Sequence, residues 1–238
     1  MANPVAITLH ALGAESGAWQ TQALDLRDPA TGIQRTGARL TLLVTAVGDN
    51  GLAVAVETSP DGSTGWRTVD EFELVTSPGS HDLALHGLER YVRASSPDAA
   101  TFALTGYAHQ LFVGEADIYA EIRREAFEGR RRSEIADALL KASDDILDAL
   151  ASAYTPPILS VGDSVRQRGA AIAAWRALCA GGLQPEGADL VPMENAKEAH
   201  AWLYRVSQGR LRPPGIVDST PHTYEGGAVV ASSPRRGW

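Results

Sequence analysis

The chain has 238 residues and a net charge of −8, with 44% hydrophobic and 21% charged residues, which is typical of a globular protein with a buried core. The acidic balance argues against a dedicated nucleic-acid binder, and the single cysteine, Cys179, excludes an intrachain disulfide or a cysteine-based metal site. No apolar run reaches the about 18 residues of a membrane span and the first residues show no signal-peptide pattern, so we expect no membrane partner and assembly in a reducing cytoplasm.

Residues 1–113 alternate apolar and polar residues with the period of a β-strand. Leu40, Leu42 and Val44 follow this alternation, a matching run covers 52–57, and Asn50-Gly51 between them predicts a hairpin. Further strands are expected at 4–10, 19–26, 66–75, 81–86, 91–95 and 101–109. Short strands with a turn every 8–12 residues are typical of a sandwich, so we predict a jelly-roll-like β-sandwich domain over 1–113.

Aromatic residues are spread along these predicted strands, and we expect them to fill the core between two sheets. They are Trp19, Trp66, Phe72, Tyr91, Phe102 and Tyr107. The alternative is an exposed aromatic platform for sugars, which would require Trp19, Trp66 and Tyr107 to share one face. The odd spacing of His81 and His86 places them on opposite faces of a strand, so we expect no metal site there.

From Gly114 onward the apolar period changes to that of α-helices. The most regular helix is predicted at 133–154, with Ile135, Leu139 and Ile146 on its apolar face, Ser133 as its N-cap and Thr155-Pro156-Pro157 as its stop. Three more helices are predicted at 114–128, 163–180, where Asp163 or Ser164 is the expected cap, and 193–208. We therefore predict an α+β protein with two segregated domains, the second being a four-helix domain over 114–212.

The last segment, 213–238, contains few apolar side chains, and ordering it would cost roughly 1–2 kcal/mol per residue. We expect an extended tail that is mobile in the free protein and orders against a partner. In that bound state Val229 and Val230 would add a strand to an exposed sheet edge, while Arg235, Arg236 and Trp238 would make further contacts.

The sequence contains few candidate catalytic or metal-binding residues. Asp144, Asp145 and Asp148 lie on one predicted helix, but no histidine or third carboxylate is arranged with them, so we interpret them as a solvated helix face. The run at 114–117 lacks the glycine spacing and the lysine of a phosphate loop, and the serines have no recognisable histidine or aspartate partners. We expect no enzyme activity, no cofactor and no catalytic or metal site.

The densest basic cluster is Arg130-Arg131-Arg132, with Arg123 and Arg124 nearby. Solvation of a helix end with contacts to local glutamates explains it most simply. The functional alternatives are docking to an acidic surface of a neighbouring protein and, less favoured, contact with DNA.

Several runs in the helical half resemble the α-helical head–tail connector proteins of tailed bacteriophages, especially the Mu-like branch. They are Ile135-x-x-Ala138-x-x-x-Ala142-Ser143-Asp144-Asp145-Ile146 with Tyr154-x-Pro156-Pro157, the run Ala170–Ala173, and Ala199-x-x-Trp202-Leu203-x-x-Val206-Ser207-x-Gly209. The end at 229–235 is similar to the short strand and basic end that close many of these chains. The small members of this family lack the sandwich, so we interpret it as an added module. Its segments 56–62 and 90–94 look like β-sandwich segments of phage structural proteins.

The resemblance implies a virion structural protein of the neck, assembled in the host cytoplasm. It would form a ring, a homo-oligomer of about twelve copies, on the portal protein and dock the next neck or tail protein, while DNA passes through the channel without specific binding. Arg130, Arg131, Arg132 and the tail residues are the expected partner contacts. The alternative is a carbohydrate- or host-surface-binding sandwich carried on a helical oligomerisation domain.

Overall fold

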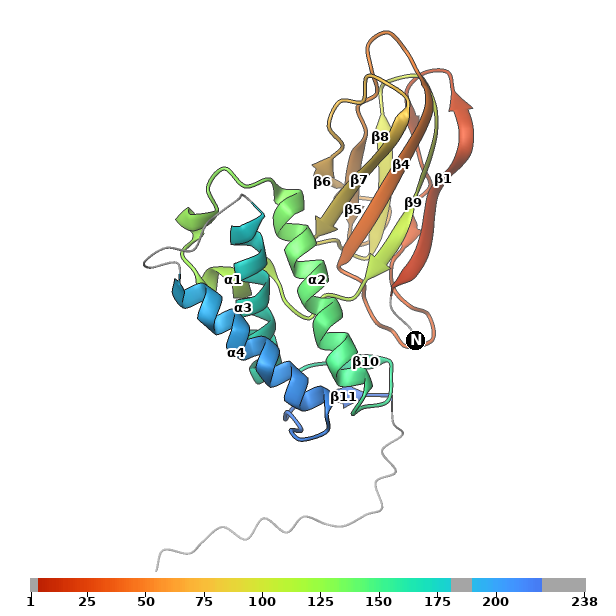
Figure 1. The fold of residues 1–238 in the computed structure, drawn as a ribbon. Coiled ribbons are helices and arrows are strands. Elements are labelled where there is room, and N and C mark those ends of the chain that lie inside the picture. The colour runs from red at the N-terminus through yellow and green to blue at the C-terminus, as the bar shows by residue number, and fades with distance from the viewer. Residues whose placement is uncertain (1–3, 181–189, 220–238) are drawn as a thin grey trace, which may run out of the picture.

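The computed structural model describes residues 4–180 and 190–219 (Figure 1). The β-strands of the first half stand beside a group of helices formed by the second half, so the α+β class predicted from the sequence is confirmed. Two separate apolar cores account for this division. One core draws its buried residues from Leu9 to Ala108 and the other from Phe112 to Val206.

Two antiparallel sheets face each other in the first half. The first sheet has the order β1 (Val5–Glu15), β9 (Ala100–His109), β4 (Gly37–Val47) and β7 (Gly79–His86). The second has the order β2 (Trp19–Gln20), β8 (Tyr91–Ser96), β5 (Ala55–Ser59) and β6 (Arg67–Glu71), with β3 (Leu24–Asp25) also paired to β8. If β2 and β3 are counted as one interrupted strand, this order and the alternation of strands between sheets are those of a jelly roll.

The predicted hairpin at Asn50-Gly51 is wrong. The strand before it, β4, pairs with β7 and β9, whereas β5 belongs to the other sheet. Gly51 adopts a φ of 84° in a turn closed by its N–H to the Gly48 carbonyl (3.0 Å), and the chain then crosses the core. The crossing is favoured because Leu52 and Val54, both 0% exposed, bury their side chains between the two sheets.

The aromatic residues divide between the core and the surface. Trp19, Phe72 and Phe102 are buried as predicted, with the Phe102 ring 4.5 Å from Trp19 and 4.3 Å from His10 between ring centroids. Trp66 and Tyr91 are only partly buried, and Tyr107 is 52% exposed on the outer side of β9. The prediction that all six fill the core is therefore wrong for these three residues: Tyr91 and Tyr107 project outward from their strands, and Trp66 lies just before β6.

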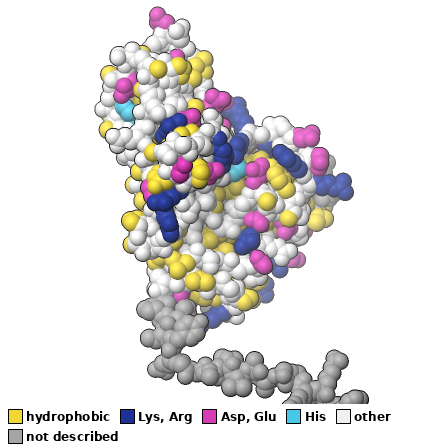
Figure 2. Space-filling model, turned by 180° about the vertical axis from the view of Figure 1, so that it is seen from behind, with side chains coloured by type: hydrophobic (Ala, Val, Ile, Leu, Met, Phe, Trp, Pro, Cys, Tyr) yellow, Lys and Arg dark blue, Asp and Glu magenta, His cyan; other side chains and the backbone are white. Residues whose placement is uncertain are grey.

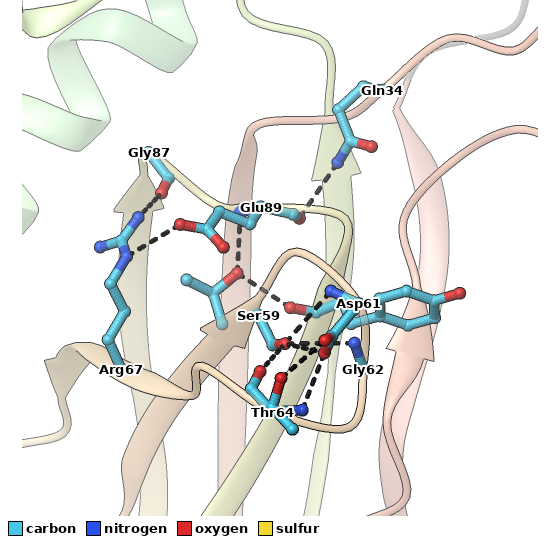
Figure 3. A network of polar contacts seen from close by, with 10 residues as sticks. Gln34, Ser59, Asp61, Gly62, Thr64, Arg67, Gly87 and Glu89 are labelled. Atoms are coloured by element: carbon cyan, nitrogen blue, oxygen red, sulfur yellow. Dashed lines mark hydrogen bonds and ion pairs between the residues drawn. The ribbon is translucent and has the colours of Figure 1, made fainter.

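The loop that joins β5 to β6 is tied by polar side chains (Figure 3). Asp61 accepts hydrogen bonds from the backbone N–H groups of Ser63 and Thr64 and from the Thr64 hydroxyl, and the Ser59 hydroxyl closes the base of the loop on the Thr64 carbonyl. These donors, with the Thr64 hydroxyl the strongest, hold the pKa of the Asp61 carboxyl well below its usual range. The loop therefore has a fixed shape at the end of the second sheet.

The second half contains α1 (Glu115–Glu121), the short 3₁₀ helix η1 (Arg124–Phe127), α2 (Arg132–Ala151), α3 (Asp163–Cys179) and α4 (Leu190–Ser207). The predicted helix at 114–128 is interrupted, because Ile122 is extended and a 3₁₀ turn follows. The predicted caps are also wrong. The N-cap of α2 is Arg131 rather than Ser133, and that of α3 is Gly162 rather than Asp163 or Ser164.

The first residues of the expected tail are packed against the helices. Pro213 is buried and its carbonyl accepts from the Tyr154 hydroxyl (3.1 Å), while β11 (Val217–Asp218) pairs with β10 (Ile158–Ser160). The Ser219 hydroxyl also bonds the carbonyl of Pro156 (2.7 Å). The boundary expected at 212/213 therefore moves to the end of this small sheet, since 213–219 belong to the helical half.

The separate cores predict that the sandwich folds alone. Because every residue of its core lies within 9–108, a fragment of residues 1–112 keeps all apolar contacts within that core and loses only those that Ala84 makes with α2. We expect a far-ultraviolet circular dichroism spectrum of β-type with a cooperative thermal transition. A helical or unfolded spectrum would contradict the domain boundary.

Candidate functional site

The only part of the predicted partner surface within the described residues is Arg130–Arg132, at the start of α2. The structure separates these three arginines. Arg130 donates a hydrogen bond to the Leu178 carbonyl at the end of α3 (3.0 Å), and Arg131 forms an ion pair with Glu73 from the connection between β6 and β7. Arg132 is exposed and lines hollows on both sides of the helix start. Local helix-end solvation thus describes Arg132 but neither Arg130 nor Arg131.

Helix α2 is the element that joins the two halves. It packs against β7 and β4, where Ala136 and Leu140 cover Ala84 of β7. The buried Ser143 hydroxyl accepts the N–H of Phe112 (3.1 Å), which ties the segment after β9 to the middle of the helix. These contacts hold the sandwich at a defined place along α2.

Ion pairs reinforce this junction, and they involve aspartates that we expected to be solvated. Asp137 pairs with Arg39 of β4, and the Asp144 carboxylate lies 3.4 Å from Nδ1 of the buried His109. On the other side of α2, Asp145 lies 2.9 Å from Arg176 of α3. The prediction of a solvated face is therefore wrong for Asp145, which pairs with Arg176 of α3, whereas the Asp144 side chain is 46% exposed beside the sandwich.

Three hollows meet around Arg132 at the junction. Their volumes are about 470, 430 and 370 Å³. Basic side chains (blue) and carboxylates (magenta) are intermixed on one face of the molecule where its two halves join (Figure 2). Within the residues that the structure describes, no cluster of histidine, cysteine and carboxylate side chains could hold a metal ion. Several of the charged side chains at the junction are paired within the chain.

One buried histidine at this junction was not singled out for a role by the sequence. His86, at the end of β7, is 4% exposed, and its Nε2 lies 3.7 Å from a carboxylate oxygen of Glu115 at the start of α1. Burial lowers the pKa of His86, and Arg132 lowers it further, while Glu115 and Asp70 oppose the shift. No sequence signal connects His86 with Glu115, because only the fold brings β7 beside α1.

This lowered pKa predicts a loss of stability on acidification. The unfolded chain protonates His86 near pH 6.5, whereas the folded chain resists protonation, so the contribution is complete above pH 6.5 and falls as the pH decreases below it. Uptake of one proton on unfolding changes the free energy of unfolding by at most about 1.4 kcal/mol per pH unit. Urea denaturation of wild type and His86→Gln at pH 7.5 and 5.5 should show a smaller pH dependence in the variant. His81→Gln, on the same strand but partly exposed, is the control, and an equal change in both variants would contradict the prediction.

The aromatic residues required for a single sugar platform do not share a face. Trp19 is buried, Tyr107 projects from the sheet of β1, β9, β4 and β7, and Trp66 lies over the other sheet, 3.9 Å from the guanidinium of Arg93. The alternative platform of Trp19, Trp66 and Tyr107 on one face is therefore not formed. The remaining predicted contacts, Val229, Val230, Arg235, Arg236 and Trp238, lie outside the described residues.

In the described part of the chain, no helix is both long and apolar enough to cross a lipid bilayer. No protein-family model matches the sequence, and no curated protein matches it. Among solved structures, a family 29 carbohydrate-binding module from Piromyces equi aligns with 45% of this chain and 91% of its own length, at 12% identity and a TM-score of 0.27. A likeness this low identifies neither fold nor function, so the function must be inferred from the chain itself.

Proposed function

We propose that this protein is a structural component of a tailed-bacteriophage virion, a head–tail connector of the neck. It would form a ring on the portal protein and present a docking surface to the next neck or tail component. The observation that carries the proposal is that most apolar residues of the connector resemblance are packing residues of the helical half. Ile135, Ala138, Ala142 and Ile146 are buried on α2, as are Ala170–Ala173 on α3 and Leu203 and Val206 on α4.

The junction supports an architectural role for the sandwich. Arg131 and Asp137 form ion pairs with Glu73 and Arg39, and Asp144 lies beside His109, so these contacts reach three different places in the sandwich, while Ala136 and Leu140 pack on Ala84. A module held in this way would move with the ring instead of swinging on a flexible linker. We infer that it braces or decorates the outer wall of the neck.

Charge also agrees with this role. The net charge is −8, and most arginines at the junction face a carboxylate of the same chain, so few remain to hold phosphates. DNA could then slide through the ring. In the described residues Arg132 makes no hydrogen bond or ion pair. It is therefore the strongest candidate to bind an acidic surface of a partner protein.

Mass photometry of the purified protein with and without its portal protein tests the proposal. We expect ring-sized occupancy only when the portal is present. Arg132→Glu should weaken that occupancy, whereas Lys197→Glu, an equal charge change at an exposed ion pair on α4, should not. Failure to associate with the portal and with every other neck protein of the same virus would refute the connector role.

A further inference from the structure

The outer side of the sheet β2-β8-β5-β6 carries a group of polar and aromatic side chains that the neck role does not use. Along β5 and β8, Val56, Thr58, Val92 and Ala94 are buried in the sandwich, so the alternating residues Glu57, Tyr91 and Arg93 face outward. Trp66, immediately before β6, and Gln20 of β2 complete this group, which we call the Trp66 face: Gln20, Glu57, Trp66, Tyr91 and Arg93.

Arg93 is the fixed centre of the Trp66 face. Its guanidinium lies 3.9 Å from the centroid of the Trp66 ring, and its Nε donates to Glu57 at 2.7 Å. With its amide oxygen turned toward Arg93, Gln20 accepts at 3.1 and 3.2 Å. The Arg93 and Glu57 side chains are only 19% and 20% exposed, so the partly buried indole is held over a shielded ion pair.

Tyr91 forms a second contact between an aromatic ring and an arginine, on the same strand as Arg93. Its ring lies 5.0 Å from the guanidinium of Arg90, which pairs with Asp25 at 2.7 Å. The ring also packs on Gly62, where a Cβ atom would come within 3.0 Å of it. The tied loop of residues 59–65 therefore fixes the position of Tyr91.

The charges on this face select among ligands. Each arginine has its own carboxylate, Arg93 with Glu57 and Arg90 with Asp25, so the face carries no excess positive charge for a phosphate or nucleic-acid backbone. What it offers instead is two partly exposed aromatic rings with carboxylate, amide and guanidinium groups beside them. Such groups donate to and accept from hydroxyls, and the rings stack against apolar C–H surfaces.

We propose that the Trp66 face binds a neutral saccharide. A pyranose ring has an apolar C–H face that would stack on Trp66, and its hydroxyls would bond Glu57 and Gln20. Trp66 immediately precedes β6 and Tyr91 begins β8, with β5 between them, so their Cα atoms are about 10 Å apart across the sheet. A saccharide chain of a few units could therefore contact both residues, which points to an oligosaccharide or polysaccharide.

Affinity electrophoresis of the full chain tests this inference independently of the neck role. Native gels would contain mannan, mixed-linkage β-glucan, dextran or a purified bacterial O-polysaccharide. We expect at least one polysaccharide to retard the wild type, and Trp66→Ala to weaken the affinity about tenfold. Tyr107→Ala is the matched control, because it removes an exposed aromatic residue from the opposite sheet, and it should run like the wild type.

Trp66→Tyr separates binding from folding, since it keeps a ring that can stack on Arg93 and on a sugar. It should retain part of the retardation with an unchanged melting temperature. The inference is overturned if no polysaccharide retards the wild type, if folded Trp66→Ala is retarded as strongly as the wild type, or if Tyr107→Ala loses as much affinity as Trp66→Ala.

Discussion

Replacement of Gly106 by valine is expected to destabilise the sandwich by about 3 kcal/mol or more. Gly106 lies in the middle of β9, opposite Leu40 of β4 and Ile7 of β1. A Cβ atom there would come within 2.1 Å of the Arg39 carbonyl oxygen and 2.9 Å of the Leu40 Cα atom. Because these are backbone atoms of a strand paired on both sides, a rotamer change cannot relieve the clash.

Urea denaturation followed by far-ultraviolet circular dichroism measures this effect. The matched control is Gly17→Val, where a Cβ atom would meet no neighbour within 4 Å and the backbone has no positive φ. We expect Gly17→Val to remain within about 0.5 kcal/mol of the wild type, as surface substitutions usually do. A Gly106→Val protein with the same midpoint as this control would show that the register of β4 and β9 is not as described.

Deletion of residues 226–238 is expected to abolish assembly at the neck and to leave the melting temperature of the free protein nearly unchanged. The contacts that close the helical half, from Pro213 to Ser219, all precede the deletion. The removed residues include Val229, Val230, Arg235, Arg236 and Trp238, the partner contacts inferred from the sequence.

Two measurements separate these effects. Thermal denaturation of the truncated monomer reports on its stability, and counting of tailed particles after complementation reports on assembly. Arg235→Ala/Arg236→Ala should impair assembly far less than the deletion, because exposed ion pairs are individually weak. Normal particle yield from the deleted protein, or protection of 226–238 from hydrogen exchange in the isolated monomer, would contradict the proposed role of the tail.

Periodicity predicted the architecture because it records which side of an element is buried. The alternation of Leu40, Leu42 and Val44 correctly marked a strand with one buried side, and the spacing of Ile135, Leu139 and Ile146 marked the buried stripe of α2. The same alternation does not specify which strands pair. Asn50-Gly51 therefore predicted a hairpin, although the burial of Leu52 and Val54 takes the chain across to the second sheet.

The junction could not be predicted in the same way. Arg131 was recognisable as part of a basic cluster, but its partner Glu73 comes from the sandwich, and nothing in the local sequence connects the two. The aspartates of α2 seemed solvated because a single helix shows its polar face and not what covers it. His109 and Arg176 become their neighbours only when the sandwich and α3 pack on opposite sides of α2.

The position of this chain in an intact virion tests the connector role most directly. Cryo-electron microscopy of the particle, with symmetry-resolved reconstruction of the neck, should show the helical half as a ring on the portal and the sandwich projecting from its outer wall. Density for the chain in the capsid shell or at the distal tail, with none beside the portal, would contradict it.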